Sequence, residues 1–166
     1  EAGAKSVLIS HQLVGPKVKR LLSLMKHHSE TRFSTILDNM DSAELLNQEA
    51  LDHELTIDIY IDINNGMNRS GIEVGHGLDE LMAFLNTCNA LHFKGFHVYD
   101  GHLRDTDFEE RNQKIEKGLE EVTAYFKAVQ EKYPDSQMIC GGTPSFTSHL
   151  INKSRITSPG TCVLWD

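Results

Sequence analysis

Two short segments of the sequence combine glycine with hydroxyl side chains, a pattern that can bind a phosphate group. They are Gly141-Gly142-Thr143 and Ser158-Pro159-Gly160-Thr161. Glycine leaves backbone N–H groups uncovered, and these groups and a threonine hydroxyl can donate hydrogen bonds to phosphate oxygens. Each segment alone is equally well explained as a turn. The two together favour a ligand that carries a phosphate.

Arg69 is a second candidate for ligand binding. It lies in a loop with Gly66 before it and Gly71 after it. A guanidinium held in such a loop can fix a carboxylate, a phenolate or a ring nitrogen with a permanent positive charge. The alternative is a surface arginine that pairs with Asp62 or Glu73, and Arg69 alone does not separate the two interpretations.

The segment of residues 97–102 carries His97, Tyr99, Asp100 and His102. In a strand, His97, Tyr99 and Gly101 share one face, so we expect Tyr99 to point with His97 into the interior, where it could contact a ligand ring or move a proton. The HxxDxH spacing also resembles a set of metal ligands, but strand alternation divides these side chains between two directions. We therefore favour hydrogen bonding and proton relay over a metal site.

Short segments rich in β-branched and aromatic residues recur along the chain and predict strands. They are residues 6–10, 32–37, 56–61, 95–99, 137–140 and 161–164. Their starts lie on average about 31 residues apart, which matches one unit of a (β/α)8 barrel, although a doubly wound sheet fits as well. Polar or glycine-rich residues follow these segments, and reactive groups of parallel α/β folds collect at the carboxyl ends of strands.

Helices are predicted between the strands from their start and stop signals. Gly15-Pro16 opens the first, and a second spans His76 to about Ala90. Two others begin with what resemble capping boxes, Asp41 with Glu44 and Thr106 with Glu109, and Tyr133-Pro134 ends the last. Strands that alternate with helices predict an α/β fold with a parallel sheet.

The composition excludes several classes of function. The chain has 166 residues, and its 16 basic and 24 acidic residues give a net charge of −8. This balance argues against binding to nucleic acid or to an anionic membrane. The three cysteines, Cys88, Cys140 and Cys162, show no CxxC spacing, so we expect small core residues in a reducing cytoplasm. No apolar run is long enough to span a membrane.

Four motifs occur in the same order as in the D-threonine aldolase family, and the sequence resembles that family over nearly its whole length. They are residues 62–71 (DINNGMNRSG), 97–102 (HVYDGH), 141–144 (GGTP) and 158–161 (SPGT), the last followed by Trp165-Asp166. The family is related to D-serine dehydratase and, more remotely, to alanine racemase. The resemblance implies a TIM barrel of the alanine racemase N-terminal type that binds pyridoxal 5'-phosphate.

The resemblance also implies roles for individual residues. Arg69 would contact the polar edge of the cofactor ring, and Tyr99 would lie near cofactor and substrate, which makes these two the candidate catalytic residues. Gly141, Gly142 and Thr143 would bind the phosphate, with Gly160 and Thr161 completing its cradle. The implied reaction is the cleavage of D-β-hydroxy-amino acids, such as D-threonine to glycine and acetaldehyde. A D-serine dehydratase, a racemase, a non-catalytic cofactor-binding protein and a metal-dependent hydrolase that uses His97, Asp100 and His102 are the alternatives.

Two parts of the family's machinery have no counterpart in this sequence. The family's Schiff-base lysine lies on the first barrel strand, before the stretch that matches Glu1, and no lysine here is predicted at the carboxyl end of a strand. The family's divalent metal is held by a C-terminal β-domain that is also unmatched. We therefore expect residues 1–166 to be a partial barrel of about six βα units from a homodimeric parent enzyme, inactive without the rest of that enzyme.

Overall fold

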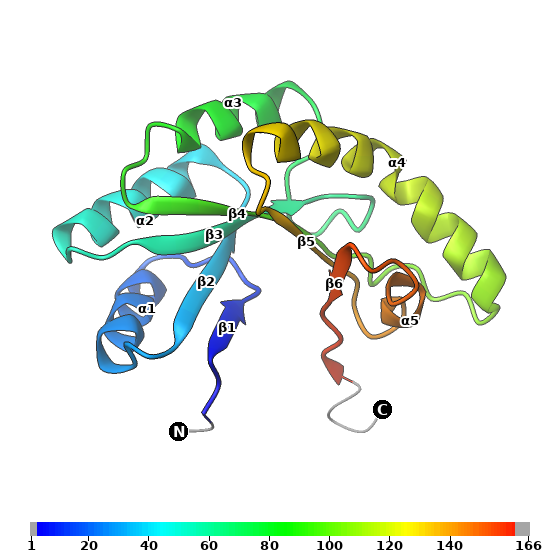
Figure 1. The fold of residues 1–166 in the computed structure, drawn as a ribbon, viewed down its shortest axis with the longest axis horizontal. Helices are drawn as coiled ribbons and strands as arrows, with labels where there is room; N and C mark the ends of the chain where they lie inside the picture. The colour runs from blue at the N-terminus through cyan, green and yellow to red at the C-terminus, as the bar shows by residue number, and fades with distance from the viewer. Residues whose placement is uncertain (1–2, 162–166) are drawn as a thin grey trace. The chain divides into compact units, whose positions relative to one another are not determined.

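The computed structural model describes residues 3–161 (Figure 1). The chain forms two compact units. Unit 1 comprises Glu1–Ile61 and His76–Lys94, and unit 2 comprises Asp62–Gly75 and Gly95–Asp166. In both, strands alternate with helices, and the observed strand pairs are parallel. The α/β class with parallel strands is therefore confirmed.

In unit 1, strand β2 lies between β1 and β3, and the core is aliphatic. The strands are β1 (Ser6–Ile9), β2 (Arg32–Leu37) and β3 (Ile57–Ile63), and the helices are α1 (Pro16–His27), α2 (Met40–Asp52) and α3 (His76–Leu85). Strand β3 runs on into unit 2. Leu21 and Leu22 of α1 are buried, as the apolar stripe of that helix requires.

In unit 2, strand β5 lies between β4 and β6. Its elements are β4 (Leu91–Val98), which begins in unit 1, α4 (Phe108–Lys132), β5 (Gln137–Cys140), α5 (Phe146–His149) and β6 (Arg155–Thr157). Phe96 of β4 packs against the ring of Phe126 on α4, with ring centroids 5.4 Å apart. Residues of β4 on the side of Phe96 therefore face α4, and His97 points away from that helix.

The predicted strand at residues 161–164 is not observed at Thr161, the last residue that the structure describes. The other three residues of that prediction lie outside the described part of the chain. The structure has β6 six residues earlier, at Arg155–Thr157, and the short helix α5 before it. Elements of three and four residues are too short to show a periodic pattern, so the sequence did not reveal them.

Both predicted capping boxes are wrong by one or two residues. The N-cap of α2 is Asn39, whose side-chain oxygen accepts a hydrogen bond from the N–H of Ser42 at 2.8 Å. The N-cap of α4 is Asp107, which accepts from the N–H of Glu110 at 2.8 Å. In each helix an Asn or Asp directly before the first turn forms the cap, since its short side chain reaches the N–H three residues on.

Some other boundaries also differ from the expectation. Helix α3 ends at Leu85 rather than near Ala90, and β4 starts four residues earlier than predicted, at Leu91. Lys94 therefore lies inside a strand, where its ammonium group is 3.8 Å from the Asp58 carboxylate, and not at the carboxyl end of that strand. Two of the three cysteines, Cys88 and Cys140, are buried and free, as expected for core residues; Cys162 lies outside the described residues.

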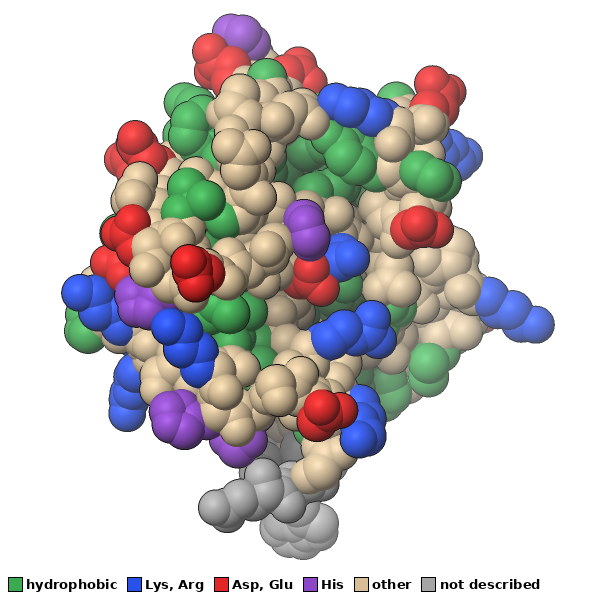
Figure 2. Space-filling view, turned by 60° about the vertical axis from the view of Figure 1, so that its left-hand side comes forward, with side chains coloured by type: hydrophobic (Ala, Val, Ile, Leu, Met, Phe, Trp, Pro, Cys, Tyr) green, Lys and Arg blue, Asp and Glu red, His purple; other side chains and the backbone are tan. Residues whose placement is uncertain are grey.

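Acidic and basic side chains are interspersed on the face shown in Figure 2. Within residues 3–161, no helix combines the length and hydrophobicity needed to cross a membrane.

Candidate functional site

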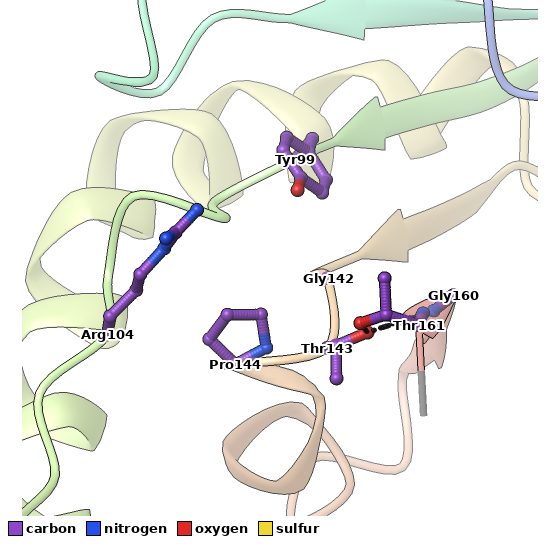
Figure 3. Close-up of a pocket in the computed structure, with 7 residues that line it drawn as sticks. All are labelled: Tyr99, Arg104, Gly142, Thr143, Pro144, Gly160 and Thr161. Atoms are coloured by element: carbon purple, nitrogen blue, oxygen red, sulfur yellow. Dashed lines mark hydrogen bonds between the residues drawn. The ribbon is translucent and has the colours of Figure 1, made fainter. Parts of the chain in front are cut away.

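A pocket of about 450 Å³ in unit 2 brings together segments that are far apart in the sequence (Figure 3). Tyr99 and Arg104 come from the segment after β4, and the other lining residues follow β5 and β6. These others are Gly142, Thr143, Pro144, Gly160 and Thr161. The pocket forms here because the carboxyl ends of adjacent parallel strands meet at one edge of the sheet. The expected convergence of the two glycine-containing segments is therefore observed.

Hydrogen-bond donors from the last loop converge on the side chain of Thr143. Its hydroxyl oxygen accepts from the backbone N–H of Gly160 at 3.2 Å and from that of Thr161 at 2.9 Å, and the Thr161 hydroxyl lies 2.8 Å away. In this structure the Thr143 oxygen is their acceptor, and an anion that binds here would take its place. A Cβ on Gly160 would meet nothing within 4 Å, so there is open space beside these donors. The residues fit a phosphate group.

Gly141 and Gly142 contribute space rather than N–H groups, in contrast to the expectation that their N–H groups are uncovered. The N–H of Gly141 donates to the carbonyl of Val98 at 2.9 Å, and that of Gly142 donates to the Ser145 hydroxyl at 3.1 Å. A Cβ on Gly142 would lie 2.5 Å from the Tyr99 ring, and one on Gly141 would lie 2.7 Å from His149. Glycine is therefore required at both positions because other side chains approach the backbone closely.

Arg69 lies over the ring of Tyr99, with its guanidinium carbon 4.5 Å from the ring centroid. This distance is that of a cation–π contact. Among the described residues, Arg69 forms no ion pair with Asp62 or Glu73, so the interpretation as a paired surface arginine is not supported. Tyr99 is half-buried and lines the pocket, so Arg69 and the Thr143 site are linked through one aromatic ring.

The loop that carries Arg69 is shaped by Asn64. The Asn64 side-chain oxygen accepts from the N–H groups of Gly66 at 3.1 Å and Asn68 at 3.0 Å. The loop then returns so closely that a Cβ on Gly71, where φ is 98°, would lie 2.6 Å from the Asn64 nitrogen. The sequence signal of glycines on both sides of Arg69 thus reflects a tightly folded loop that fixes the position of the arginine backbone.

His97 forms a buried pair with Asp62. The distance from His97 Nδ1 to Asp62 Oδ1 is 2.7 Å, and both side chains are 4% exposed. The Ser70 hydroxyl donates to the other carboxylate oxygen of Asp62 at 2.9 Å. The hydrogen-bonding role predicted for this motif is therefore present at His97.

Asp100 forms a second buried pair, with a residue that the sequence analysis did not single out. His149 Nε2 lies 2.7 Å from Asp100 Oδ2, and both side chains are 1% exposed. The Ser145 hydroxyl donates to Asp100 Oδ1. Ser145 and His149 are four residues apart at α5, directly after the GGTP motif, and this spacing is the signal that could have indicated them.

The second pair continues into an ion pair. Arg155 donates to both carboxylate oxygens of Glu116, at 2.6 and 2.8 Å, and its Nη1 lies 3.4 Å from His149 Nδ1. The hydrogen bonds from Arg155 hold the pKa of Glu116 below its usual value. Burial opposes the charge of Arg155, but the hydrogen bonds and charge of Glu116, together with nearby groups that include Asp100, raise the pKa of Arg155.

The HxxDxH spacing does not form a metal centre. His97 and Asp100 bind different partners, as strand alternation predicts. Within the part of the chain that the structure describes, no three His, Cys, Asp or Glu side chains lie together as a metal site requires.

The sequence profile of the alanine racemase N-terminal domain matches residues 12–165. The chain belongs to this family. Members of the alanine racemase family depend on pyridoxal phosphate, so its phosphate is a natural ligand for the donors around Thr143. The family assignment and the parallel strands confirm the expected fold, an incomplete barrel of the alanine racemase type.

Individual relatives of this alanine racemase-type chain act on D-hydroxy-amino acids. It is 25% identical over 142 residues to a 3-hydroxy-D-aspartate aldolase of Paracoccus denitrificans (strain Pd 1222), and the match covers 84% of the chain but 36% of that enzyme. The crystal structure of D-threonine aldolase from Filomicrobium marinum matches with a TM-score of 0.80 and 27% identity, over 96% of this chain and 43% of the aldolase. A D-threo-3-hydroxyaspartate dehydratase variant shares the fold, with a TM-score of 0.77 at 14% identity.

Proposed function

We propose that this chain belongs to a pyridoxal-phosphate-dependent lyase that cleaves D-β-hydroxy-amino acids into glycine and an aldehyde. The observation that carries the proposal is the pocket of unit 2, where the donors around Thr143 and the Arg69–Tyr99 pair are linked through the Tyr99 ring. A ligand with a phosphate and a polar aromatic ring matches both features. The similarity to a 3-hydroxy-D-aspartate aldolase and a D-threonine aldolase supports the reaction type.

The residues of the chain would divide the work of binding and orientation. Thr143, Gly160 and Thr161 would hold the phosphate through their N–H and hydroxyl groups. Arg69 would place a permanent positive charge at the polar edge of the ring. The Tyr99 phenol, on a ring that Arg69 and Gly142 both contact, would orient the substrate and hold or move a proton.

Pyridoxal phosphate, when bound, supplies an electron sink for the carbanion at the α-carbon of the amino acid. The chain spans 36% and 43% of the two aldolases it matches, so the activity is proposed for the whole protein. By the resemblance, the lysine that anchors the cofactor and the ligands of a divalent metal would be supplied by regions of those enzymes that this chain does not match. A homodimeric, cytoplasmic enzyme is part of the same proposal.

The test is cofactor binding and product analysis with the complete protein. Added pyridoxal phosphate should give an absorbance band that borohydride fixes to a lysine, and no band would overturn the proposal. D-Threonine with a divalent metal should give glycine and acetaldehyde, and D-3-hydroxyaspartate should give glycine and glyoxylate. Ammonia and a keto acid would indicate a dehydratase instead, and conversion of D-threonine to its C2 epimer, L-allo-threonine, without cleavage would indicate a racemase.

Two variants separate binding from turnover. Tyr99→Phe removes only the phenol oxygen, so we expect bound cofactor with turnover reduced by roughly 10²- to 10⁴-fold, the range of a general acid or base. Full activity of this variant would remove Tyr99 from the mechanism. Arg69→Ala should weaken cofactor retention with little change in thermal stability, because an exposed cation–π contact contributes only about 0.5–1 kcal/mol.

A further inference from the structure

A chain of hydrogen-bonded side chains, all buried except the exposed Glu116, connects α4 to the loop that follows β5. It consists of five side chains, Glu116, Arg155, His149, Asp100 and Ser145, and it ends at the backbone N–H of Gly142. We infer that Ser145, Asp100 and His149 are positioning residues that hold this loop in the geometry that binds the cofactor's phosphate. This inference rests on the proposed function and deepens it.

The direction of the hydrogen bonds follows from the chemistry of Arg155. A guanidinium has donors only, so His149 Nδ1 must accept from Arg155, and its Nε2 must carry the hydrogen that it donates to Asp100. His149 is then a neutral imidazole in a single tautomer. Arg155 itself is anchored by both oxygens of Glu116, so these two residues fix the orientation of the His149 ring.

The end of the hydrogen-bond chain at Ser145 fixes the loop that follows β5. With both oxygens of Asp100 bound, the Ser145 hydroxyl directs its hydrogen to Asp100 and its lone pairs to the Gly142 N–H at 3.1 Å. Gly142 is adjacent to Thr143, on which the donors of Gly160 and Thr161 converge. Ser145 therefore sets the course of the backbone one residue before the phosphate site.

Stability alone does not account for this arrangement. Asp100, Ser145 and His149 are each at most 1% exposed, and the removal of charged and polar groups from water is costly. Well-packed apolar side chains would stabilise such a position at least as well. The polar chain instead gives the loop a single, directional set of hydrogen bonds next to Tyr99, which a Cβ at Gly142 would approach to 2.5 Å.

The test compares pyridoxal phosphate with pyridoxal, which lacks the phosphate, by absorbance titration of the complete protein. Ser145→Ala should weaken the binding of pyridoxal phosphate about tenfold, equivalent to about 1.4 kcal/mol, and leave the binding of pyridoxal unchanged. Ser148→Ala is the matched control. Ser148 lies in α5, three residues after Ser145, and is 1% exposed, but its hydroxyl has no hydrogen-bond partner among the described residues. This control should bind both ligands like the wild type.

A second pair of variants tests His149, in the middle of the hydrogen-bond chain. Gln at position 149 retains a side-chain N–H that can donate to Asp100, so His149→Gln should preserve more of the preference for the phosphate form than His149→Leu. Equal losses for both ligands in Ser145→Ala would show a general structural role and overturn the inference, as would unchanged binding of pyridoxal phosphate. If the wild type binds no pyridoxal phosphate, the proposed function itself fails.

Discussion

Two Ser–Asp–His chains of the same composition lie near the end of β4, and they differ in what they hold. In the first, Ser70 and His97 bind the two oxygens of Asp62; in the second, Ser145 and His149 bind those of Asp100. Both Asp–His distances are 2.7 Å. The first chain joins β3 and β4 to the loop that carries Arg69, whereas the second reaches the loop beside the phosphate site.

The histidines use different nitrogen atoms, and this difference decides what each can do. His97 faces its aspartate with Nδ1, so a neutral His97 that donates there keeps a lone pair on Nε2. His149 faces its aspartate with Nε2, and its Nδ1 is occupied by Arg155. Among the described residues, both ring nitrogens of His149 therefore have partners, whereas Nε2 of His97 has none. The His149 set thus orients a loop, and the His97 set leaves one nitrogen that can act as a base.

The largest difference is expected for loss of the histidines. His149→Leu should lower the free energy of unfolding by roughly 3 kcal/mol, because it removes a hydrogen bond to the buried Asp100 carboxylate, which then keeps only the Ser145 hydroxyl as a donor. His97→Leu should cost less, since within residues 3–161 the His149 ring contacts two side chains and the His97 ring contacts one. Urea unfolding measures both. Equal losses would show that the contact with Arg155 adds nothing.

The serines should differ in the same sense but by less. Ser145 is fully buried and also accepts the Gly142 N–H, so Ser145→Ala should cost about 1–3 kcal/mol. Ser70 is only half-buried, so water can replace its hydroxyl, and Ser70→Ala should cost less than about 1 kcal/mol. The same unfolding experiment measures both, and a larger loss for Ser70→Ala would reverse the comparison.

The ion pair at the end of the second chain predicts a pH dependence. Because Arg155 lowers the pKa of Glu116 below 4.5, folding favours the ionised carboxylate. The stability that this provides is present above the unfolded-state pKa and is lost as the pH falls through the lowered folded-state pKa. The wild type should therefore be more stable than Glu116→Gln at pH 7, and the two should converge as the pH falls well below 4.5. A constant difference over this range would contradict the assignment.

The smallest effect is expected for the thiol of Cys140, near the Ser145–Asp100–His149 hydrogen bonds. Burial raises the pKa of Cys140 to about 12, so the thiol should resist iodoacetamide at pH 8 in the folded protein. In His149→Leu the loosened surroundings should increase its labelling, whereas Cys88, which is buried in unit 1, should remain unlabelled. Mass spectrometry of each cysteine separates the two. Equal acceleration at both sites would indicate global unfolding instead.

Local sequence patterns were sufficient to predict many of the strands and helices. The predicted bounds of β2 and β5 agree with the structure because both strands are short segments rich in β-branched or other apolar residues, with turn-forming residues directly after them. Helix α4 ends where Tyr133-Pro134 predicts. Strand β6 and helix α5 were missed because three or four residues carry no period, and their positions depend on contacts with Glu116 and Asp100.

Part of the candidate site was also predictable from the sequence. Loops at strand ends must meet at one edge, so the sequence indicated that Thr143, Gly160 and Thr161 lie together. It did not reveal that Asp100 pairs with His149, because 49 residues separate them and no local rule links the two. It also did not reveal that the N–H groups of Gly141 and Gly142 are already bound within the protein.

The contact between Gly142 and Tyr99 sets a rule for redesign of this pocket. Any side chain at position 142 would begin 2.5 Å from the aromatic ring, so changes at that position alone should yield misfolded or empty protein. A library that reshapes the pocket for bulkier substrates must therefore vary positions 99 and 142 together, with a smaller residue at one for each larger residue at the other. The two positions must therefore be chosen as a pair, although 42 residues lie between them in the sequence.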